Sequence, residues 1–285
     1  MSSQQFAQLS HLTTDSRARA LAEMSSGTEL DVLVIGGGIT GAGIALDAAT
    51  RGLRTGIVEA GDWAAGTSAW SSKLIHGGLR YLYNLDFKLV TEALKERGLL
   101  LEKIAPHLVH AQPFLWPLKT PVIERSYSAI GIGMYDALAY FGSRGKKGVP
   151  SQRHFTKKGT KTVFPDIKDS AFTGAIQFYD ARVDDARLVV DVVRTASGYG
   201  ALAASRTQVV GIDKDTSGKV VGARLADLES GQELTVKAKH IINATGVWTE
   251  ESESLANPDA GLEVLASKGI HIVVPRDRIQ ATSGI

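Results

Sequence analysis

One stretch of the chain, residues 31–59, constrains the fold most because it has the order of a complete strand–helix–strand unit. Residues 31–35 (DVLVI) form a mostly apolar, β-branched run that is typical of a buried parallel strand. The sequence GGGITG follows at once over residues 36–41, and an alanine-rich segment after it predicts a helix. A second apolar run over residues 55–58 ends at Glu59. This succession of elements is that of a dinucleotide-binding turn.

The glycines of this turn and the acid that follows each have a physical task in dinucleotide binding. Gly36 allows the tight turn out of the strand, Gly38 lets a pyrophosphate approach the backbone, and Gly41 lets the helix pack closely on the strand. The helix N-terminus presents free N–H groups to phosphates. Glu59 lies about 20 residues on, the distance typical of a carboxylate that binds the ribose. A glycine-rich loop in an ordinary α/β domain explains neither the additional Gly37 nor Glu59.

The composition excludes several classes of function. The chain has 285 residues, of which 44% are hydrophobic and 22% charged, as in soluble globular proteins. Its net charge of +2 gives no strong field for nucleic acid, so we expect no such partner. It has no cysteine, and no metal site is expected. No apolar run approaches the roughly 18 residues of a membrane span and no signal peptide is recognisable, so we expect a cytoplasmic protein, with attachment to a membrane surface left open.

The segment after Glu59 carries further candidate contacts to a cofactor. Residues 60–73 are rich in small and hydroxyl side chains, which can wrap closely around a ligand and donate hydrogen bonds. A solvated serine–glycine loop has the same composition, and only the position directly after the acid favours cofactor contact. The candidate residues are Thr67, Ser68, Ser72 and Lys73.

Residues 74–82 (LIHGGLRYL) place a histidine, two glycines, an arginine and a tyrosine within six positions. Arg80 can bind a phosphate or carboxylate through two parallel hydrogen bonds, and Tyr81 offers a hydroxyl beside it. His76 is a candidate acid or base. On these residues alone a structural role stays open, because an isolated histidine is more often structural than catalytic.

These motifs resemble the FAD-dependent glycerol-3-phosphate dehydrogenases, which are flavoproteins of the D-amino-acid-oxidase type. The resemblance rests on VIGGGITGAGIALDAATRGL at residues 34–53 and, most specifically, on SSKLIHGGLRYL at residues 71–82. Further similar segments follow as far as residue 275, among them YDARVDDARL at residues 179–188 and NATG at residues 243–246. Family members are far longer, so the chain resembles only their N-terminal half.

The resemblance implies FAD as cofactor and oxidation of sn-glycerol 3-phosphate to dihydroxyacetone phosphate, with hydride passing to flavin N5 and electrons then to a quinone. It also implies that Arg80 anchors the substrate with Tyr81 beside it, and that Lys73 and His76 lie near the flavin. Two other functions stay open: a related flavin oxidase that uses oxygen, and a truncated, non-catalytic remnant that binds FAD weakly. Peripheral attachment to the inner face of the cell membrane and a homodimer are also left open.

The expected fold is α/β, a two-part FAD-binding Rossmann-like domain with an interleaved α+β substrate domain that is incomplete at the C-terminus. A three-stranded meander, with turns near residues 215–219 and 230–231, is expected before a separate parallel strand over residues 239–243. By resemblance the backbone near Val209 and the turn at Ala244 and Gly246 lie close to the cofactor. The expected parts are a flexible tail (1–29), a first FAD-binding part (30–105), a helical or substrate-side insertion (106–195), a second FAD-binding part (196–255) and the start of a substrate-domain sheet (256–285), with a strand over residues 268–275.

Three other features have structural interpretations that we favour. His107 and His110 have near-metal spacing, but no further ligand cluster accompanies them. Asp184 and Asp185 stand where a helix is expected to begin, and acids there stabilise the helix dipole. The basic residues between 144 and 161 indicate a solvated surface, with attraction to anionic lipid headgroups as the alternative.

Overall fold

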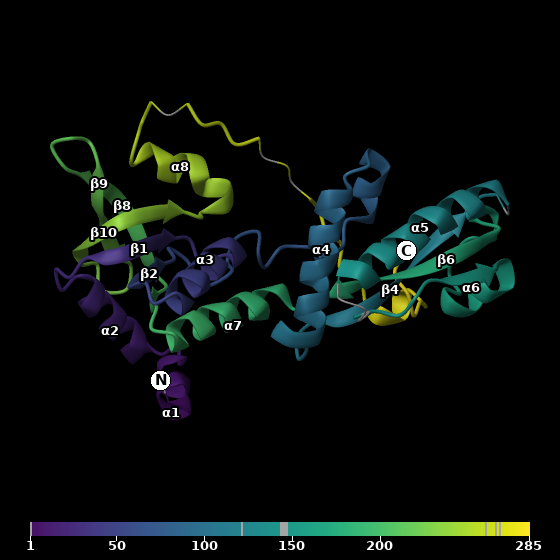
Figure 1. Cartoon of the computed structure of the whole chain (residues 1–285), viewed down its shortest axis with the longest axis horizontal. Helices are drawn as coiled ribbons and strands as arrows, with labels where there is room; N and C mark the ends of the chain where they lie inside the picture. The colour runs from purple at the N-terminus through teal and green to yellow at the C-terminus, as the bar shows by residue number, and fades with distance from the viewer. Residues whose placement is uncertain (1, 121, 143–147, 260, 266, 268) are drawn as a thin grey trace. The chain divides into compact units, whose positions relative to one another are not determined.

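The computed structural model describes residues 2–120, 122–142, 148–259, 261–265, 267 and 269–285 (Figure 1). The chain forms two compact units, one from Met1–Ser71 with Asp185–Gly269 and one from Ser72–Asp184 with Ile270–Ile285. These divisions differ from the expected boundaries at 105/106 and 195/196. The segment after Ser71 joins the second unit because its strand and helix pair and pack there, whereas the helix that begins at Asp185 packs within the first unit.

The first unit is built on a six-stranded mixed sheet of order β7-β2-β1-β10-β9-β8. Its parallel part has β10 paired to β1, β1 to β2 and β2 to β7, and its meander pairs β8, β9 and β10 antiparallel. A parallel sheet joined to a meander is the predicted arrangement. The bounds are β1 (Leu30–Ile35), β2 (Thr55–Val58), β7 (Leu202–Ala204), β8 (Thr207–Lys214), β9 (Val220–Asp227) and β10 (Glu233–Asn243).

The expected third meander strand and the separate parallel strand are one continuous strand, β10. Its residues 233–237 pair antiparallel with β9, and its residues 238–243 pair parallel with β1. The sequence ELTVKAKHIIN contains no glycine, proline or other turn residue before Asn243, so nothing interrupts the extended backbone. One strand therefore links the meander directly to the parallel sheet.

Helices α3 (Ile39–Thr50) and α7 (Asp185–Gly198) cover one face of this sheet. The buried cluster there joins Val34 and Ile57 of the sheet to alanines of α3 and valines of α7. Alanine at buried positions of α3 lets that helix approach the strands and α7 closely. The glycine-rich turn at the start of α3 is thereby fixed to the sheet.

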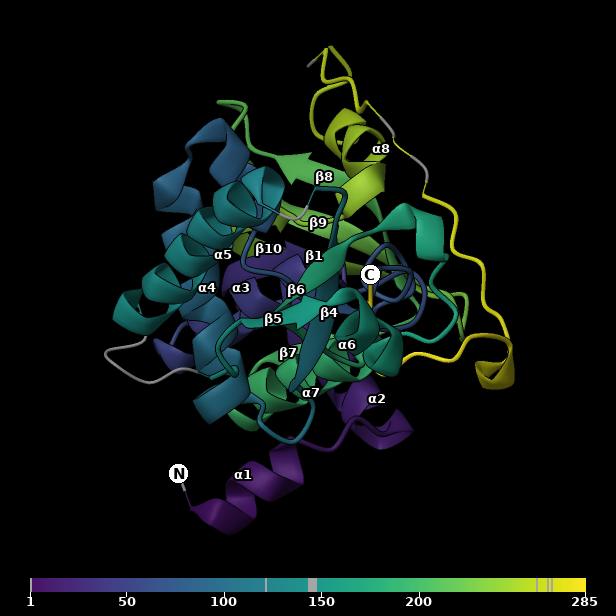
Figure 2. The ribbon, with the colours of Figure 1, turned by 90° about the vertical axis from the view of Figure 1, so that its right-hand side faces the viewer.

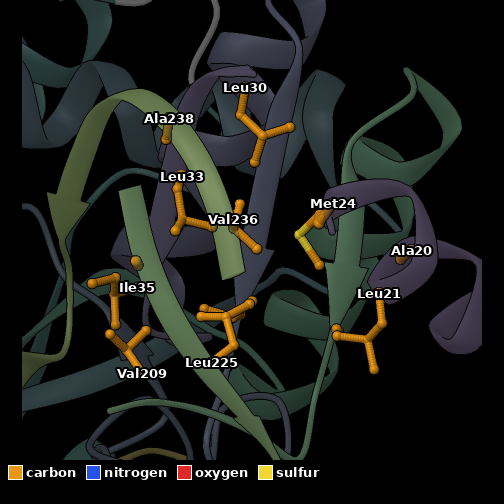
Figure 3. Close-up of a cluster of buried hydrophobic side chains, with 13 residues drawn as sticks. Ala20, Leu21, Met24, Leu30, Leu33, Ile35, Val209, Leu225, Val236 and Ala238 are labelled. Carbon is orange, nitrogen blue, oxygen red and sulfur yellow. The ribbon is translucent and has the colours of Figure 1, made fainter. Parts of the chain in front are cut away.

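Residues 2–29 are not the flexible tail that the sequence predicts for residues 1–29. They form α1 (Ser3–Leu9) and α2 (Thr14–Met24), and α2 is part of the core on the other face of the sheet. Figure 3 shows Leu21 and Met24 of α2 in one cluster with Leu30 and Leu225 of the strands. A capping box between Thr13 and Ser16 begins the helix. Burial of large apolar side chains, at about 1.5–3 kcal/mol each, explains why this segment is ordered.

A partly buried ion pair also attaches α2 to the meander. The Arg17 guanidinium donates to the Asp227 carboxylate and to the carbonyl oxygens of Ser205 and Arg206. The hydrogen bond from Arg17 is the largest cause that lowers the pKa of Asp227 to about 2, and the hydroxyl of Ser230 adds to it. A carboxyl whose pKa falls on folding stabilises the folded state above its ordinary pKa, near 4, and this stabilisation is lost as the pH falls toward 2.

We expect Arg17→Met to lower the free energy of unfolding by about 2 kcal/mol at pH 7 because the Asp227 carboxylate loses its main partner. The difference from the wild type should shrink as the pH falls below 4, which urea unfolding at pH 7, 5, 4 and 3 would measure. Arg19→Met is the matched control because Arg19 is an exposed residue of the same helix. Equal effects of the two substitutions at pH 7 would contradict the role given to Arg17.

The second unit is built on an antiparallel sheet whose long central strand is β6 (Gly174–Arg182). Strand β4 (His110–Leu118) pairs with β6 along its whole length, while β3 (Leu74–Ile75) and β5 (Arg153–Thr156) pair with opposite ends of β6. The sheet contacts α5 and α6 (Figure 2). The helices of this unit are α4 (Phe87–Leu99), followed by a π-helical turn (Leu100–Ile104), α5 (Ile123–Gly142) and α6 (Lys157–Val163).

The strand expected over residues 268–275 is absent from the described part of that segment, residues 269–275. Lys268 itself lies outside the described residues. Ile270, Ile272 and Val273 are more than four-fifths exposed, and residues 269–275 carry no strand pairing. Near the end of the chain, Gly284 forms a single bridge with Phe114 of β4.

Candidate functional site

The glycine-rich turn after β1 is packed so closely that side chains would not fit at three of its positions. A Cβ atom on Gly36, whose φ is +112°, would lie 2.5 Å from the carbonyl oxygen of Ala244. One on Gly37 would lie 2.5 Å from the ring of Trp63, and one on Gly41 only 1.9 Å from the carbonyl oxygen of Gly36. The structure therefore explains the glycines through backbone approach, as the sequence pattern predicts.

Backbone hydrogen bonds join the carboxyl ends of three parallel strands at this turn. The Gly36 N–H donates to the carbonyl oxygen of Val58 in β2 at 2.9 Å. The Ala244 N–H donates to Ile35 in β1 at 2.8 Å, and Gly246 follows with φ +61°. Ligands of open α/β sheets bind at this end of the strands. The predicted residues Gly36, Ala244 and Gly246 are thus brought to one edge of the first unit.

The side chain of Glu59 lies directly against the glycine-rich turn. One carboxylate oxygen accepts the N–H of Gly37 and the other the N–H of Gly61, each at 2.6 Å. A carboxylate offers about four lone-pair positions, so each oxygen keeps a second one for another donor. The half-buried acid is therefore fixed in place with capacity for ligand hydroxyl groups.

Ser68 lies at the N-terminus of α3. Gly38 occupies the N-cap position without a side chain, and the Ser68 hydroxyl accepts the N–H of Ile39 at 2.9 Å. The hydroxyl thus does what an N-cap side chain does, and its own proton is free to be donated to a ligand. The neighbouring Thr67 is exposed.

Two tryptophans that the sequence analysis did not single out pack around the turn. The ring of Trp63 packs against Gly37. The ring of Trp248 packs against Gly66, where an added Cβ atom would lie 2.9 Å from it. The available signal was their position, Trp63 in the loop that follows Glu59 and Trp248 two residues after the NATG turn. They hold the small-residue loop and the NATG turn against their neighbours in the first unit.

The structure places the side chain of Val209 in a core cluster of the first unit, beside Ile35 of β1 (Figure 3). Its buried side chain leaves only its backbone for a ligand. The strand that carries it begins beside the acid, because the Thr207 N–H donates to the backbone carbonyl of Glu59 at 2.8 Å. The contact expected of Val209 stays a prediction.

The remaining candidates belong to the second unit. Ser72, Lys73 and His76 are exposed, and Tyr81 is 40% exposed. Lys73 has φ +61°, and its carbonyl oxygen accepts the N–H of Val183 at 2.9 Å. The backbone of Arg80 is part of a 3₁₀-helix (Leu79–Asn84), but its side chain lies outside the described residues.

A buried polar network that the sequence did not predict lies beneath this motif. One carboxylate oxygen of Asp180 accepts from the Arg97 guanidinium and the Tyr135 hydroxyl, both at 2.6 Å, and from the Gly77 N–H at 3.0 Å. The side chains of Arg97 and Asp180 are 3% and 9% exposed. Burial, and then the negative charge of Asp180, raise the pKa of Tyr135 far above its ordinary value, so its hydroxyl stays a donor.

Among the described residues, no group of three or more histidine and acidic side chains is placed to hold a metal ion. Among the same residues, no helix combines the length and apolar character needed to cross a bilayer. The basic residues Arg144, Lys146 and Lys147 lie outside the described part, and Lys161 pairs with Asp169 at 3.0 Å.

Comparisons with known proteins agree with the geometry of the turn. Residues 31–284 match the family model described as FAD dependent oxidoreductase, DAO. The chain is 51% identical over 262 residues to glycerol-3-phosphate dehydrogenase 2 of Mycobacterium tuberculosis, an alignment that covers 92% of this chain and 44% of that relative. It is 37% identical over 276 residues to the alpha-glycerophosphate oxidase of Streptococcus pyogenes, covering 95% of this chain and 44% of the oxidase.

Among solved structures, the chain is similar to the glycerol-3-phosphate dehydrogenase of Bacillus halodurans complexed with FAD. The TM-score is 0.62 with 30% identity, and the match covers 85% of this chain and 39% of that one. The chain therefore spans less than half the length of each of these relatives.

Proposed function

The chain belongs to the family of FAD-dependent oxidoreductases, and from this premise we propose that it oxidises sn-glycerol 3-phosphate to dihydroxyacetone phosphate with FAD as cofactor. The observation that carries the proposal is the 51% identity to a glycerol-3-phosphate dehydrogenase over 92% of the chain. The family match spans both the glycine-rich turn and the His76–Tyr81 motif. Because the chain covers 44% of that relative, the activity of the whole relative applies here as a proposal.

The turn after β1 has the features that an FAD site requires. The N-terminus of α3 would take the diphosphate beside Gly38, which caps the helix without a side chain. The N–H groups of Gly36 and Gly37 already bond Val58 and Glu59, so these two glycines would shape the turn. Glu59 would accept hydrogen bonds from the ribose, and Ser68 would donate from the start of the helix. When bound, FAD supplies the two-electron acceptor that the reaction needs.

The substrate would be held by the exposed motif of the second unit. Arg80 would bind the dianionic phosphate through two parallel hydrogen bonds, with Tyr81 and Lys73 as neighbouring donors. Oxidation at C2 removes a hydride from carbon and a proton from the hydroxyl, which leaves a ketone. His76 would accept that proton, a role supported by its exposure beside the buried Gly77 and Gly78.

A membrane quinone is the electron acceptor that we favour, and oxygen is the second candidate. The dehydrogenases among the relatives favour the first, whereas the 37% identity to a streptococcal oxidase favours the second. A quinone acceptor would place the protein in the cytoplasm at the inner face of the membrane. Oxygen consumption with hydrogen peroxide release, measured against reduction of a soluble quinone, separates the two.

The visible absorption spectrum of the purified 285-residue chain tests the proposal. We expect a flavin spectrum after purification or addition of FAD, and loss of its long-wavelength band on anaerobic addition of sn-glycerol 3-phosphate. A yellow protein whose band persists would make the chain a non-catalytic FAD-binding protein. A chain that retains no FAD would contradict the proposed cofactor site.

Glu59→Gln should weaken FAD binding about 10- to 100-fold, because hydrogen bonds to a charged carboxylate contribute roughly 1.5–3 kcal/mol. The neutral amide would also direct an NH₂ group toward the N–H of Gly37 or Gly61. Fluorescence titration with FAD measures the effect. Asp62→Asn removes the same charge from an exposed neighbour and should change the dissociation constant less than about twofold. Equal losses in the two variants would count against Glu59 as a contact.

A further inference from the structure

A contribution to the stability of the fold does not explain why Arg97 and Asp180 form a buried ion pair. Replacing a buried ion pair by apolar side chains of similar volume is often neutral or stabilising. Here the pair is supplemented by Tyr135, whose hydroxyl bonds both Asp180 at 2.6 Å and Arg97 at 3.2 Å. A third donor to the same carboxylate is the peptide N–H of Gly77. This last contact connects the network to the motif that carries His76, Arg80 and Tyr81.

The hydrogen bond at Gly77 fixes the backbone between the exposed side chains of His76 and Tyr81. Strand β3 before it pairs with Ala181 and Arg182 of β6, so Asp180 continues the attachment of the segment to β6 by one more position. A Cβ atom on Gly77 would lie 2.3 Å from the Tyr135 hydroxyl and 2.2 Å from Leu94. The buried Gly77 therefore rests directly on the network while His76 is exposed beside it.

The chain turns sharply after this contact. Gly78 has φ +78°, a left-handed conformation that glycine adopts without strain, and the 3₁₀-helix with Arg80 and Tyr81 follows. The hydrogen bond from the Gly77 N–H to Asp180 anchors the backbone between β3 and this 3₁₀-helix. The direction in which His76 and Tyr81 project therefore depends on Asp180.

We propose that Asp180, held by Arg97 and Tyr135, is the positioning residue that sets the conformation of the His76–Tyr81 segment for binding a phosphate-bearing substrate. The identity of that substrate rests on the proposed function, whereas the positioning rests on the contacts. The charge balance suits the task. The Arg97 guanidinium neutralises the carboxylate, so the segment is anchored without a net negative charge beneath a site for a dianion.

Tyr135→Phe tests the proposal because it removes one donor to Asp180 and keeps the ring. Tyr140→Phe, at a 43% exposed position of the same helix, is the matched control. We expect hydrogen exchange of the amides of residues 76–82 to accelerate about tenfold in Tyr135→Phe, as for loss of one hydrogen bond to a charged group. Exchange in the first unit and in the control variant should stay unchanged.

The same two variants, loaded with FAD, should differ in binding sn-glycerol 3-phosphate. Calorimetry should show a dissociation constant about five- to tenfold higher for Tyr135→Phe. In turnover, KM should rise while kcat changes little, because the lost interaction is one made equally in the ground and transition states. A role confined to stability would shift the unfolding midpoint without this division between KM and kcat.

Unchanged exchange at residues 76–82 would overturn the proposal, and so would faster exchange with unaltered affinity. If the wild-type chain binds FAD but no glycerol 3-phosphate, the proposed function fails, and the exchange measurement alone decides the positioning. Asp180→Asn is a second variant that should accelerate exchange in the same segment more than Tyr135→Phe does. The opposite order would also overturn the assignment to Asp180.

Discussion

Asp180→Ala is expected to lower the free energy of unfolding of the second unit by about 3–5 kcal/mol, the cost of leaving a buried charge without its partner. Arg97 is the charge in question, with a side chain only 3% exposed. Its Nη1 also donates to the carbonyl oxygen of Tyr179 at 3.0 Å, but this acceptor is uncharged, and its Nε lacks a hydrogen-bond partner among the described residues. The Tyr135 hydroxyl and the Gly77 N–H would lose the same acceptor.

Denaturant unfolding, followed by hydrogen exchange of each unit, would measure this loss. Asp169→Ala is the control, since Asp169 also pairs with a cation, Lys161, but its side chain is 70% exposed. Exposed pairs contribute about 0–1 kcal/mol, so the control should change stability little. The double variant Arg97→Met with Asp180→Leu should recover most of the loss because it removes both charges. Similar losses for Asp169→Ala and Asp180→Ala would contradict this account.

The strand–helix–strand unit and the meander were predictable because their signals are local. Each strand is a short run of apolar and β-branched residues, and each turn carries glycine or aspartate at the required place. The packing around Gly36 and Gly41 follows from the same pattern, since only backbone approach requires glycine there. Glu59 could be assigned from its spacing, and the structure places its side chain on the N–H of Gly37.

The buried network was not predictable because its members are distant in sequence and unremarkable in pattern. Arg97 lies in a helix rich in lysine and glutamate, where a solvated position is the natural expectation. Asp180 is 83 positions away from it in the sequence. Nothing local distinguishes an arginine that points to solvent from one that a sheet covers, so tertiary packing alone decides it.

Two predictions about the fold were wrong, for different reasons. The N-terminal segment is rich in polar residues overall, which indicated a tail, but the apolar face of Ala20, Leu21 and Met24 was sufficient for burial. The division of β10 into two strands assumed that a change of pairing partner needs a turn. One extended strand can pair with different neighbours along its length, and this pattern leaves no mark in the sequence.

In the glycine-rich turn, a single added methyl group should abolish cofactor binding. In Gly41→Ala the added Cβ would lie 1.9 Å from the carbonyl oxygen of Gly36, which is far inside contact distance. Gly36 is held in place by the hydrogen bond from its N–H to the carbonyl oxygen of Val58 at 2.9 Å, which opposes a shift of the turn. We expect FAD affinity to fall more than about 100-fold, with a stability loss of about 1–3 kcal/mol from overpacking.

Gly43→Ala offers a matched control within the same helix, since no atom lies within 4 Å of its Cβ position. Alanine replaces glycine in a helix with a gain of about 0.5–1 kcal/mol, so this variant should unfold at a slightly higher temperature and bind FAD as the wild type does. Flavin retained after gel filtration and the unfolding midpoint with and without FAD separate the two variants. If Gly41→Ala keeps its flavin, the diphosphate does not bind at this turn. If both variants lose it, the helix N-terminus tolerates no change at all, and close approach at Gly41 is not the cause.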